Sequence, residues 1–176
     1  LVKDLNKQGA GLDNIDMKYC AERNLTVVFA PAGNANAVAE HGLMLMLMCA
    51  KRFNYVDKKF REGNFLVRVG LQNTIELEGK TLGVIGCGRI SSLLMKKCKY
   101  GMGMKVIGYD PYLTQDKVGD LVELKKTAKE VWEQADFVSV HLPVVDSTKY
   151  SIGREQFSWM KPTASFINVA RGAVTD

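Results

Sequence analysis

Short apolar runs that alternate with helix-like segments constrain the fold of this chain more than any other feature. The strand-like runs in the larger part of the chain are KTLGVIG (80–86), KVIGYD (105–110), ADFVSVHLP (135–143) and ASFINVA (164–170). The helix-like segments between them cover 89–101, roughly 121–135, and 154–160. Strands that alternate with helices form parallel βαβ units, with helices on both faces of the sheet. The sequence therefore predicts an α/β fold built on a doubly wound parallel sheet.

The first third of the chain contains one more strand-like run and a long helix. LTVVFA (25–30) is apolar and is broken by Pro31 and Gly33, and a helix begins at Asn34 or Asn36. From 42 to 50 this helix has no polar side, so it must be covered all round. The cover is either the core of one chain or a second subunit.

The segments that follow strands are the candidate binding residues, because doubly wound sheets bind ligands at the carboxyl ends of their strands. These segments are Gly86–Ser91, Asp110, His141–Pro143 and Val169–Arg171. We expect them to gather along one edge of the sheet.

The turn GCGRIS (86–91) resembles the glycine fingerprint of dinucleotide-binding folds, but Ser91 stands at the third glycine position. Of the G-x-G triplets in the chain, only this one follows a strand and opens a helix. Gly86 permits the sharp turn, and Gly88 lets a pyrophosphate approach the backbone amides at the start of the helix. We expect Ser91 to bond back to the carbonyl of Cys87, which leaves the phosphate contacts possible.

Asp110 decides which dinucleotide the turn would bind. It ends the next strand, 19 positions after Ser91, and an acid at about this distance bonds the adenosine ribose hydroxyls and repels a 2′-phosphate. The prediction is NAD rather than NADP. The alternative is an acid in a surface turn before Pro111.

Composition excludes several other classes of protein. The net charge of +5 is spread over helix-like segments without a basic tail, so nucleic acid is not an expected partner. The longest apolar run is far shorter than a membrane span. The four cysteines have no C-x-x-C spacing, so we expect no metal site and a reducing, cytoplasmic setting. Cys49 and Cys87 are expected to be small packing residues.

Six stretches together resemble the D-isomer-specific 2-hydroxyacid dehydrogenases, nearest the phosphoglycerate dehydrogenase and hydroxypyruvate or glyoxylate reductase branches. They are GAGLDNID (9–16), NANAVAEH (34–41), GKTLGVIGCGRI (79–90), VIGYDPY (106–112), HLP (141–143) and NVARGAVTD (168–176). The sequence departs from the family at Ser91 and in the longer YGMGMK stretch.

The resemblance implies a two-domain protein of which this chain is an excerpt. Residues 1–30 would be the last piece of the N-terminal part of a substrate domain, and residues 31–176 an incomplete NAD-binding domain. The helix over 36–53 would join a homodimer.

The resemblance also assigns residue roles. Arg171 would be the catalytic arginine that fixes and polarises a small anionic 2-hydroxy or 2-oxo acid, while Ala10 and Gly11 hold its carboxylate. The residues that would cradle the pyrophosphate are Gly86, Gly88, Arg89 and Ile90, with Asp110 on the ribose. Those lining the rest of the cofactor groove would be Leu142, Pro143, Val169 and Ala170.

The acid–base histidine of the family is expected beyond residue 176. We interpret His41 as a packed helix residue and His141 as a groove residue, and we expect this chain alone to bind NAD without turnover. Three alternatives stay open: an NAD(H)-sensing binding module, the NAD domain of an unrelated dehydrogenase, and, for Arg171 alone, a surface salt bridge. The sequence does not separate phosphoglycerate from glyoxylate, hydroxypyruvate or lactate.

Overall fold

The computed structural model of the chain describes residues 2–9 and 11–176. The strands are β1 (Asp4–Lys7), β2 (Thr26–Phe29), β3 (Thr81–Ile85), β4 (Lys105–Tyr109), β5 (Glu123–Leu124), β6 (Phe137–Val140) and β7 (Ser165–Asn168). The α-helices are α1 (Met17–Glu22), α2 (Ala35–Ala50), α3 (Phe53–Arg61), α4 (Arg89–Lys96), α5 (Gln115–Val118), α6 (Ala128–Gln134) and α7 (Arg154–Ser158). A π-helical turn (Lys97–Gly101) extends α4, and a 3₁₀ turn (Gly172–Val174) follows β7.

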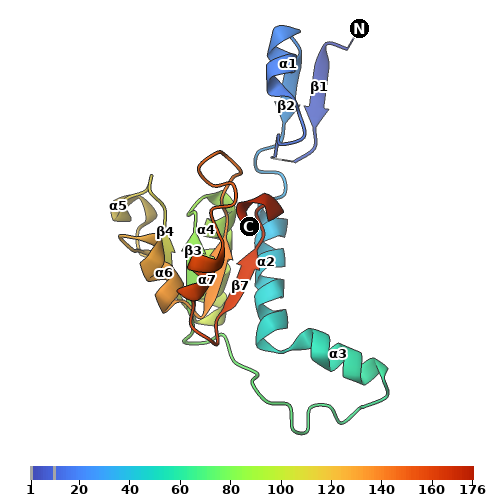
Figure 1. Cartoon of the computed structure of the whole chain (residues 1–176), viewed down its shortest axis with the longest axis vertical. Helices are drawn as coiled ribbons and strands as arrows, with labels where there is room; N and C mark the ends of the chain where they lie inside the picture. The colour runs from blue at the N-terminus through green and yellow to red at the C-terminus, as the bar shows by residue number, and fades with distance from the viewer. Residues whose placement is uncertain (1, 10) are drawn as a thin grey trace.

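A five-stranded parallel sheet forms the centre of the main domain, with the strand order β5-β4-β3-β6-β7 (Figure 1). The chain moves outward from β3 through β4 to β5 and then crosses back to β6 on the other side of β3. Leu82 of β3 accordingly pairs with Val106 on one side and Phe137 on the other. The strand order therefore reverses between β3 and β6, and this switch point is where such sheets bind ligands. The predicted doubly wound parallel sheet is confirmed.

Alternating side chains of the strands fill two cores, one on each face of the sheet. Leu82 and Val84 face the core that α2 and α4 cover, whereas Ile85 belongs to the core under α6. At Gly83 an added Cβ would lie 2.7 Å from the Cβ of Ala135, so the glycine lets α6 pack directly on β3. Burial on both faces explains why β6 is apolar at three of its four positions, Phe137, Val138 and Val140.

Helix α2 is only partly covered by its own chain. Ala39, Met46 and Ala50 are buried against the sheet and α4, but the Met44 side chain is 43% exposed on the opposite face. Cys49 is also exposed, so our expectation that it is a packing residue is wrong. Cys87 is buried, as expected, and burial raises the pKa of its thiol to about 12. Cys49 is exposed to solvent because it lies on the side of α2 that no other part of the described chain packs against.

A second helix, α3, follows α2 almost directly and covers Phe53–Arg61. Helix α3 extends away from the main domain, as Figure 1 shows. It displays exposed aromatic side chains, Phe53, Tyr55 and Phe60. We call these three side chains, together with the exposed Met44 of α2, the α2–α3 surface.

The helix expected over 121–135 is shorter than predicted. Glu123 and Leu124 instead pair with Ile107 and Gly108 as the edge strand β5. Helix α6 begins after Thr127, whose hydroxyl accepts a hydrogen bond from the amide of Glu130. This Thr-x-x-Glu capping pattern is visible in the sequence, and it gives the correct start of the helix.

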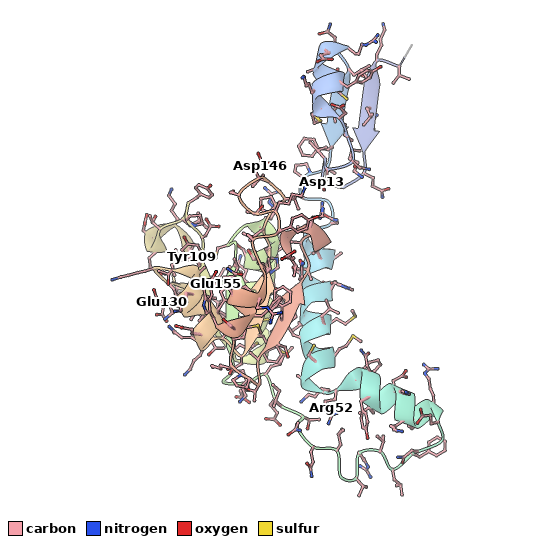
Figure 2. The ribbon with its side chains drawn as sticks, viewed as in Figure 1. Asp13, Arg52, Tyr109, Glu130, Asp146 and Glu155 are labelled. Atoms are coloured by element: carbon pink, nitrogen blue, oxygen red, sulfur yellow. The ribbon has the colours of Figure 1, made fainter. Side chains whose placement is uncertain are left out.

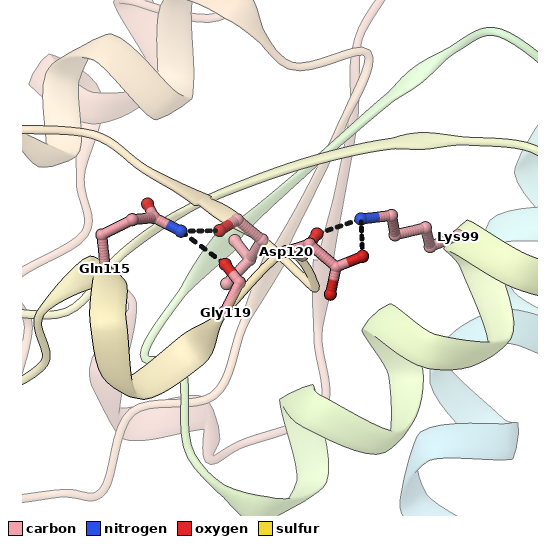
Figure 3. A network of polar contacts seen from close by, with 5 residues as sticks. Lys99, Gln115, Gly119 and Asp120 are labelled. Atoms are coloured by element: carbon pink, nitrogen blue, oxygen red, sulfur yellow. Dashed lines mark hydrogen bonds and ion pairs between the residues drawn. The ribbon is translucent and has the colours of Figure 1, made fainter.

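The helix expected over 89–101 is continuous, but its last turn is π-helical, at the point where the sequence is longer than the family pattern. Figure 3 shows the contacts beside it: Lys99 bonds the backbone and carboxylate of Asp120. In the same loop, the Gln115 amide donates to the carbonyls of Gly119 and Val122 at 2.6 and 2.9 Å. These contacts connect the end of the helix to the loop before β5, away from the carboxyl ends of the strands.

The N-terminal residues form a separate small unit. Strands β1 and β2 pair in parallel, with α1 between them in sequence, and the unit lies beyond one end of the main domain (Figure 1). Among the described residues every helix is too short or too polar to span a bilayer. In the same ranges, no three His, Cys, Asp or Glu side chains gather where they could hold a metal ion.

Candidate functional site

Two cavities meet at the carboxyl ends of the strands. The first, here called the glycine-turn cavity, has a volume of about 650 Å³ and is lined by Gly86, Gly88, Asp110 and residues of α6 and α7. The second, here called the arginine cavity, has about 450 Å³ and is lined by Arg171, Ile90, Val169 and Ala170. His141, Leu142 and Pro143 line both. The expected gathering of strand-end segments therefore holds, and the two cavities form one groove across the switch point.

The glycine turn has the geometry that a bound phosphate requires. Gly86 has φ +90°, and a Cβ there would approach the carbonyl oxygen of His141 to 3.1 Å, so the turn itself needs this glycine. Gly88 is different, because apart from its neighbours along the chain no atom of the described residues lies within 4 Å of the position its Cβ would take. The space in front of Gly88, at the N-terminus of α4, is therefore open to a ligand. Helix N-termini with free amides favour anions there.

Ser91 is fully buried and does not enter the groove. Its hydroxyl donates to the carbonyl of Gly88 at 2.9 Å, rather than to that of Cys87 as we expected. The hydroxyl bonds the carbonyl three residues back rather than four, because Gly88 is the N-cap of α4. The Gly88 carbonyl therefore points along the helix, toward the first turn that contains Ser91. The serine hydroxyl is thus satisfied inside the helix, and it leaves the phosphate side of the turn clear.

Asp110 has a structural role that its sequence position alone does not reveal. Its carboxylate accepts hydrogen bonds from the amides of Cys87 and Tyr112, each at 2.9 Å. The first bond ties the end of β4 to the glycine turn, and the second closes the turn after Asp110. The same carboxylate lines the glycine-turn cavity. Asp110 therefore supports the turn and also faces the space where a ribose would lie.

The two histidines lie in different surroundings. His141 is half-buried, and desolvation by this burial lowers the pKa of its imidazole to about 4. Its Nε2 lies 2.9 Å from the hydroxyl of Ser139, so the neutral ring is a fixed part of the groove wall, in keeping with the role we assigned it. His41 is exposed on α2 and lines a shallow cavity with Val169 and Ala170. Our interpretation of His41 as a packed residue is wrong, because α2 leaves that side uncovered.

The half-buried His141 predicts a pH-dependent stability. Between the unfolded pKa of about 6.5 and the folded value of about 4, only the unfolded state gains a proton, so stability falls as the pH falls through this window. The full effect is on the order of 3 kcal/mol. Thermal unfolding at pH 7 and at pH 4.5 should show a smaller loss for His141→Gln than for the wild type. Equal losses would contradict the neutral imidazole.

Arg171 follows β7 and faces the groove from the side opposite Asp110. Its Nε donates to the Asp13 carboxylate at 2.8 Å, and its Nη1 to the carbonyl of Ala170 at 2.9 Å. The Asn168 side chain braces the turn, because its amide donates to the Arg171 carbonyl and its oxygen accepts from the Ala170 amide. The guanidinium is therefore held at the mouth of the arginine cavity.

The N-terminal unit supplies the other wall beside Arg171. A Cβ on Gly11 would lie 2.1 Å from Nη2 of Arg171, so the missing side chain is what makes room for the guanidinium. Ala10, the other expected substrate residue, lies outside the described residues. Arg89 is exposed at the start of α4 and lines neither cavity. Asp13 was not among the expected site residues, and its only sequence signal is its place within GAGLDNID.

The groove fits a dinucleotide. It joins an open anion site at a helix N-terminus, a carboxylate at the end of the neighbouring strand, and a second cavity that ends at a guanidinium. The helix N-terminus and the strand-end carboxylate are the parts that the doubly wound fold uses to bind the pyrophosphate and ribose of such cofactors. The fold and the site together define a nucleotide-binding α/β domain.

Comparison with known proteins assigns the family. Residues 43–176 match the model described as "D-isomer specific 2-hydroxyacid dehydrogenase, NAD binding domain". The chain belongs to the D-isomer-specific 2-hydroxyacid dehydrogenases, and the resemblance seen in the sequence is confirmed. The cofactor of this domain family is NAD, as the glycine turn and Asp110 predicted.

Similar sequences include D-3-phosphoglycerate dehydrogenase of Methanocaldococcus jannaschii, which is 39% identical over 99% of this chain. Hydroxypyruvate reductase of Thermotoga maritima is 36% identical, also over 99% of the chain. The chain spans 33% of the first of these relatives and 55% of the second.

Solved structures with the same fold include D-lactate dehydrogenase of Escherichia coli, with a TM-score of 0.85 and 30% identity. The Aquifex aeolicus D-lactate dehydrogenase, solved with NAD and lactic acid, has a TM-score of 0.82 and 32% identity. Each match covers 99% of this chain, and 54% and 51% of those chains respectively.

Proposed function

We propose that the protein containing this chain is an NAD-dependent oxidoreductase. It transfers a hydride between NAD(H) and C2 of a small D-2-hydroxy or 2-oxo acid, with 3-phosphoglycerate as one candidate. The observation that carries this proposal is the position of Arg171, whose guanidinium borders the arginine cavity directly beside the dinucleotide groove. Family membership supports the same reaction class.

Arg171 suits this chemistry because a 2-oxo acid presents a carboxylate next to the reacting carbonyl. A planar guanidinium can bind the carboxylate and polarise the carbonyl oxygen with one rigid group. Bound NADH supplies the hydride. As negative charge grows on the substrate oxygen, the fixed cation of Arg171 lowers the barrier.

Most of the proposed cofactor contacts line the groove, whereas Arg89 lies outside both cavities at the start of α4. Gly86, Gly88, Arg89 and Ile90 would hold the pyrophosphate and Asp110 the ribose, while the groove beyond is lined by Leu142, Pro143, Val169 and Ala170. On the substrate side, Gly11 and Ala10 would offer backbone amides. Burial lowers the pKa of the His141 imidazole to about 4, so at neutral pH the ring carries no extra proton to donate to a 2-oxo acid during its reduction. We expect that group from a part of the protein outside these 176 residues.

A panel of 2-oxo acids tests the proposal. The full-length protein should oxidise NADH with at least one of glyoxylate, hydroxypyruvate, pyruvate and 3-phosphohydroxypyruvate, followed at 340 nm. Tight NADH binding without turnover of any 2-oxo acid would contradict the enzyme and favour an NAD(H)-sensing module. The substrate that reacts fastest would also identify the branch of the family.

Asp110 makes a second, independent prediction about cofactor choice. Loss of a hydrogen bond to a charged group costs about 2 kcal/mol, or roughly 30-fold in binding. Asp110→Ala should therefore weaken NADH binding by about that factor and NADPH binding much less. Asp110→Asn is the matched variant, because its amide oxygen still accepts from Cys87. Isothermal titration of both cofactors measures the ratio, and an unchanged ratio would reject the ribose role.

We also propose the domain and subunit arrangement that the resemblance implied. Residues 1–30 would be part of a substrate domain, residues 31–176 the NAD-binding domain, and the helix over 36–53 the homodimer contact. The separate β1–β2 unit supports the division, and the exposed Met44 and Phe53 support the contact. The four free cysteines suit a reducing, cytoplasmic compartment.

The dimer predicts a simple change in mass. Met44→Glu places a charge on the α2–α3 surface and should shift the protein from dimer to monomer in sedimentation velocity. Tyr100→Glu, at an exposed aromatic residue in the π-helical turn, serves as the control and should leave the mass unchanged. If the Met44→Glu protein remains a dimer, the interface does not include this part of α2.

A further inference from the structure

We propose that Asp13 is a positioning residue for Arg171, and that Gly11 shapes the space in which the guanidinium is held. This inference rests on the proposed function, because it concerns how the catalytic cation reaches its working position. The pair connects distant parts of the chain: Asp13 lies in the N-terminal unit, whereas Arg171 follows the last strand of the main sheet. Figure 2 labels Asp13 at the junction between the two.

The contact restrains one edge of the guanidinium. Asp13 Oδ2 lies 2.8 Å from Nε of Arg171, which is the geometry of a charge-assisted hydrogen bond. The hydrogen bond from Arg171 lowers the pKa of the Asp13 carboxyl below its usual value, and Lys7 acts in the same direction more weakly. Asp13 is therefore ionised at neutral pH and stays a constant partner of the cation.

The remaining donors of Arg171 suit a substrate carboxylate. Of the five N–H groups of a guanidinium, one on Nε donates to Asp13 and one on Nη1 donates to Ala170. The other three belong to the two terminal nitrogens, and none has an acceptor among residues 2–9 and 11–176. Within the described residues, both N–H groups of Nη2 and one of Nη1 are therefore left for a ligand. Asp13 occupies Nε and does not need to leave when a carboxylate binds these terminal nitrogens.

Gly11 limits where the guanidinium can lie. The position of a Cβ on Gly11 is 2.1 Å from Nη2 of Arg171 and 2.9 Å from Oδ2 of Asp13. Its backbone φ lies outside the positive region, so alanine fits the backbone there. The conflict would be with the flexible ends of two side chains, Arg171 and Asp13, and not with the backbone. A methyl group at Gly11 would therefore move the guanidinium without removing the backbone amide.

A structural role alone explains the pair less well. The side chains of Arg171 and Asp13 are 48% and 51% exposed, and an ion pair this open to solvent contributes little to folding. The ion pair instead fixes the position of the Arg171 guanidinium, and this matters because small displacements of a catalytic group have large effects on rate. The pair also makes the position of Arg171 depend on where the N-terminal unit lies.

Kinetics of the full-length protein test this role. Asp13→Ala should lower kcat/KM for the active 2-oxo acid roughly 10- to 100-fold, with an unchanged Kd for NADH. Asp13→Asn, which keeps an oxygen acceptor, should recover part of that loss. Gly11→Ala should cause a loss similar to that of Asp13→Ala. The control is Asp4→Ala, at an exposed carboxylate of β1, which should behave as the wild type.

A double-mutant cycle separates positioning from a general effect of charge. In an Arg171→Lys background the Nε contact is already gone, so Asp13→Ala should add less than about threefold. Binding of oxamate to the protein–NADH complex gives a readout without turnover, and Asp13→Ala should weaken it. Tighter oxamate binding would show that Asp13 competes with substrate, and additive losses would show that it acts independently; either result overturns the inference.

The failure of this inference is distinguishable from the failure of the proposed function. If Arg171→Lys leaves catalysis intact, the catalytic assignment itself is wrong. If Arg171→Lys inactivates the protein while Asp13→Ala matches the Asp4→Ala control, only the positioning role is wrong.

Discussion

Replacing Arg171 with lysine is expected to lower kcat/KM for the 2-oxo acid on the order of 10³-fold, because removal of one pre-placed donor to a developing oxyanion costs this much. Lysine keeps a positive charge but loses the planar fork, which binds a carboxylate and a neighbouring carbonyl together. Arg171→Ala removes the charge as well and should be at least as inactive. Stopped-flow or steady-state oxidation of NADH by the full-length protein measures the loss.

The same substitution should leave cofactor binding and folding nearly intact. Arg171 is half exposed and its ion pair with Asp13 lies in solvent, so the folding cost is about 1 kcal/mol or less. NADH fluorescence titration should give a Kd within about twofold of the wild type. Arg154→Lys, at the exposed first residue of α7, is the matched control. An Arg171→Lys protein with full activity would reject the proposed role of the guanidinium.

The second large effect is expected at Gly88. The position of its Cβ is empty of protein atoms, so Gly88→Ala puts a methyl group into the space where the pyrophosphate would approach the amides. Overpacking of this kind costs about 1–3 kcal/mol, which corresponds to roughly 10- to 100-fold weaker NADH binding. The predicted result is loss of NADH affinity, measured by calorimetry, in a protein that still folds.

Gly101→Ala is the control for this prediction, since it also has free space at its Cβ and no positive φ, but lies in the π-helical turn away from the groove. The Gly88→Ala protein should still fold, because alanine is a poorer helix cap than glycine by only about 1 kcal/mol or less. Its Tm should therefore fall by only about 2–4 °C.

Unchanged NADH affinity in Gly88→Ala would show that no ligand approaches this turn closely. It would remove the physical basis for the dinucleotide groove.

The sheet and its glycine turn were predictable because their signals are local. Each buried parallel strand is a short apolar run in the sequence. The turn is marked by two glycines, Gly86 at the sharp corner and Gly88 at the open anion site. Gly86 illustrates the limit of this reasoning. Its positive φ follows from the turn, but its contact with the His141 carbonyl depends on β6 lying next to β3.

Errors arose where tertiary contacts override local pattern. Glu123 and Leu124 look helical beside lysines, but pairing with β4 makes them an edge strand. Cys49 lies in an apolar helix, yet no part of the described chain covers its side of α2. Ser91 bonds Gly88 rather than Cys87 because the cap geometry brings the nearer carbonyl into reach.

The amino-acid sequence by itself determined the α/β class, the family and the type of cofactor, since these depend on the order of apolar runs and on motifs within one turn or strand end. Only the tertiary structure decided what surrounds Arg171. Its partner Asp13 lies 158 positions away, and no local pattern specifies a contact over that distance. The contact exists because folding brings the N-terminal unit to the carboxyl ends of the strands, where charge and open space meet.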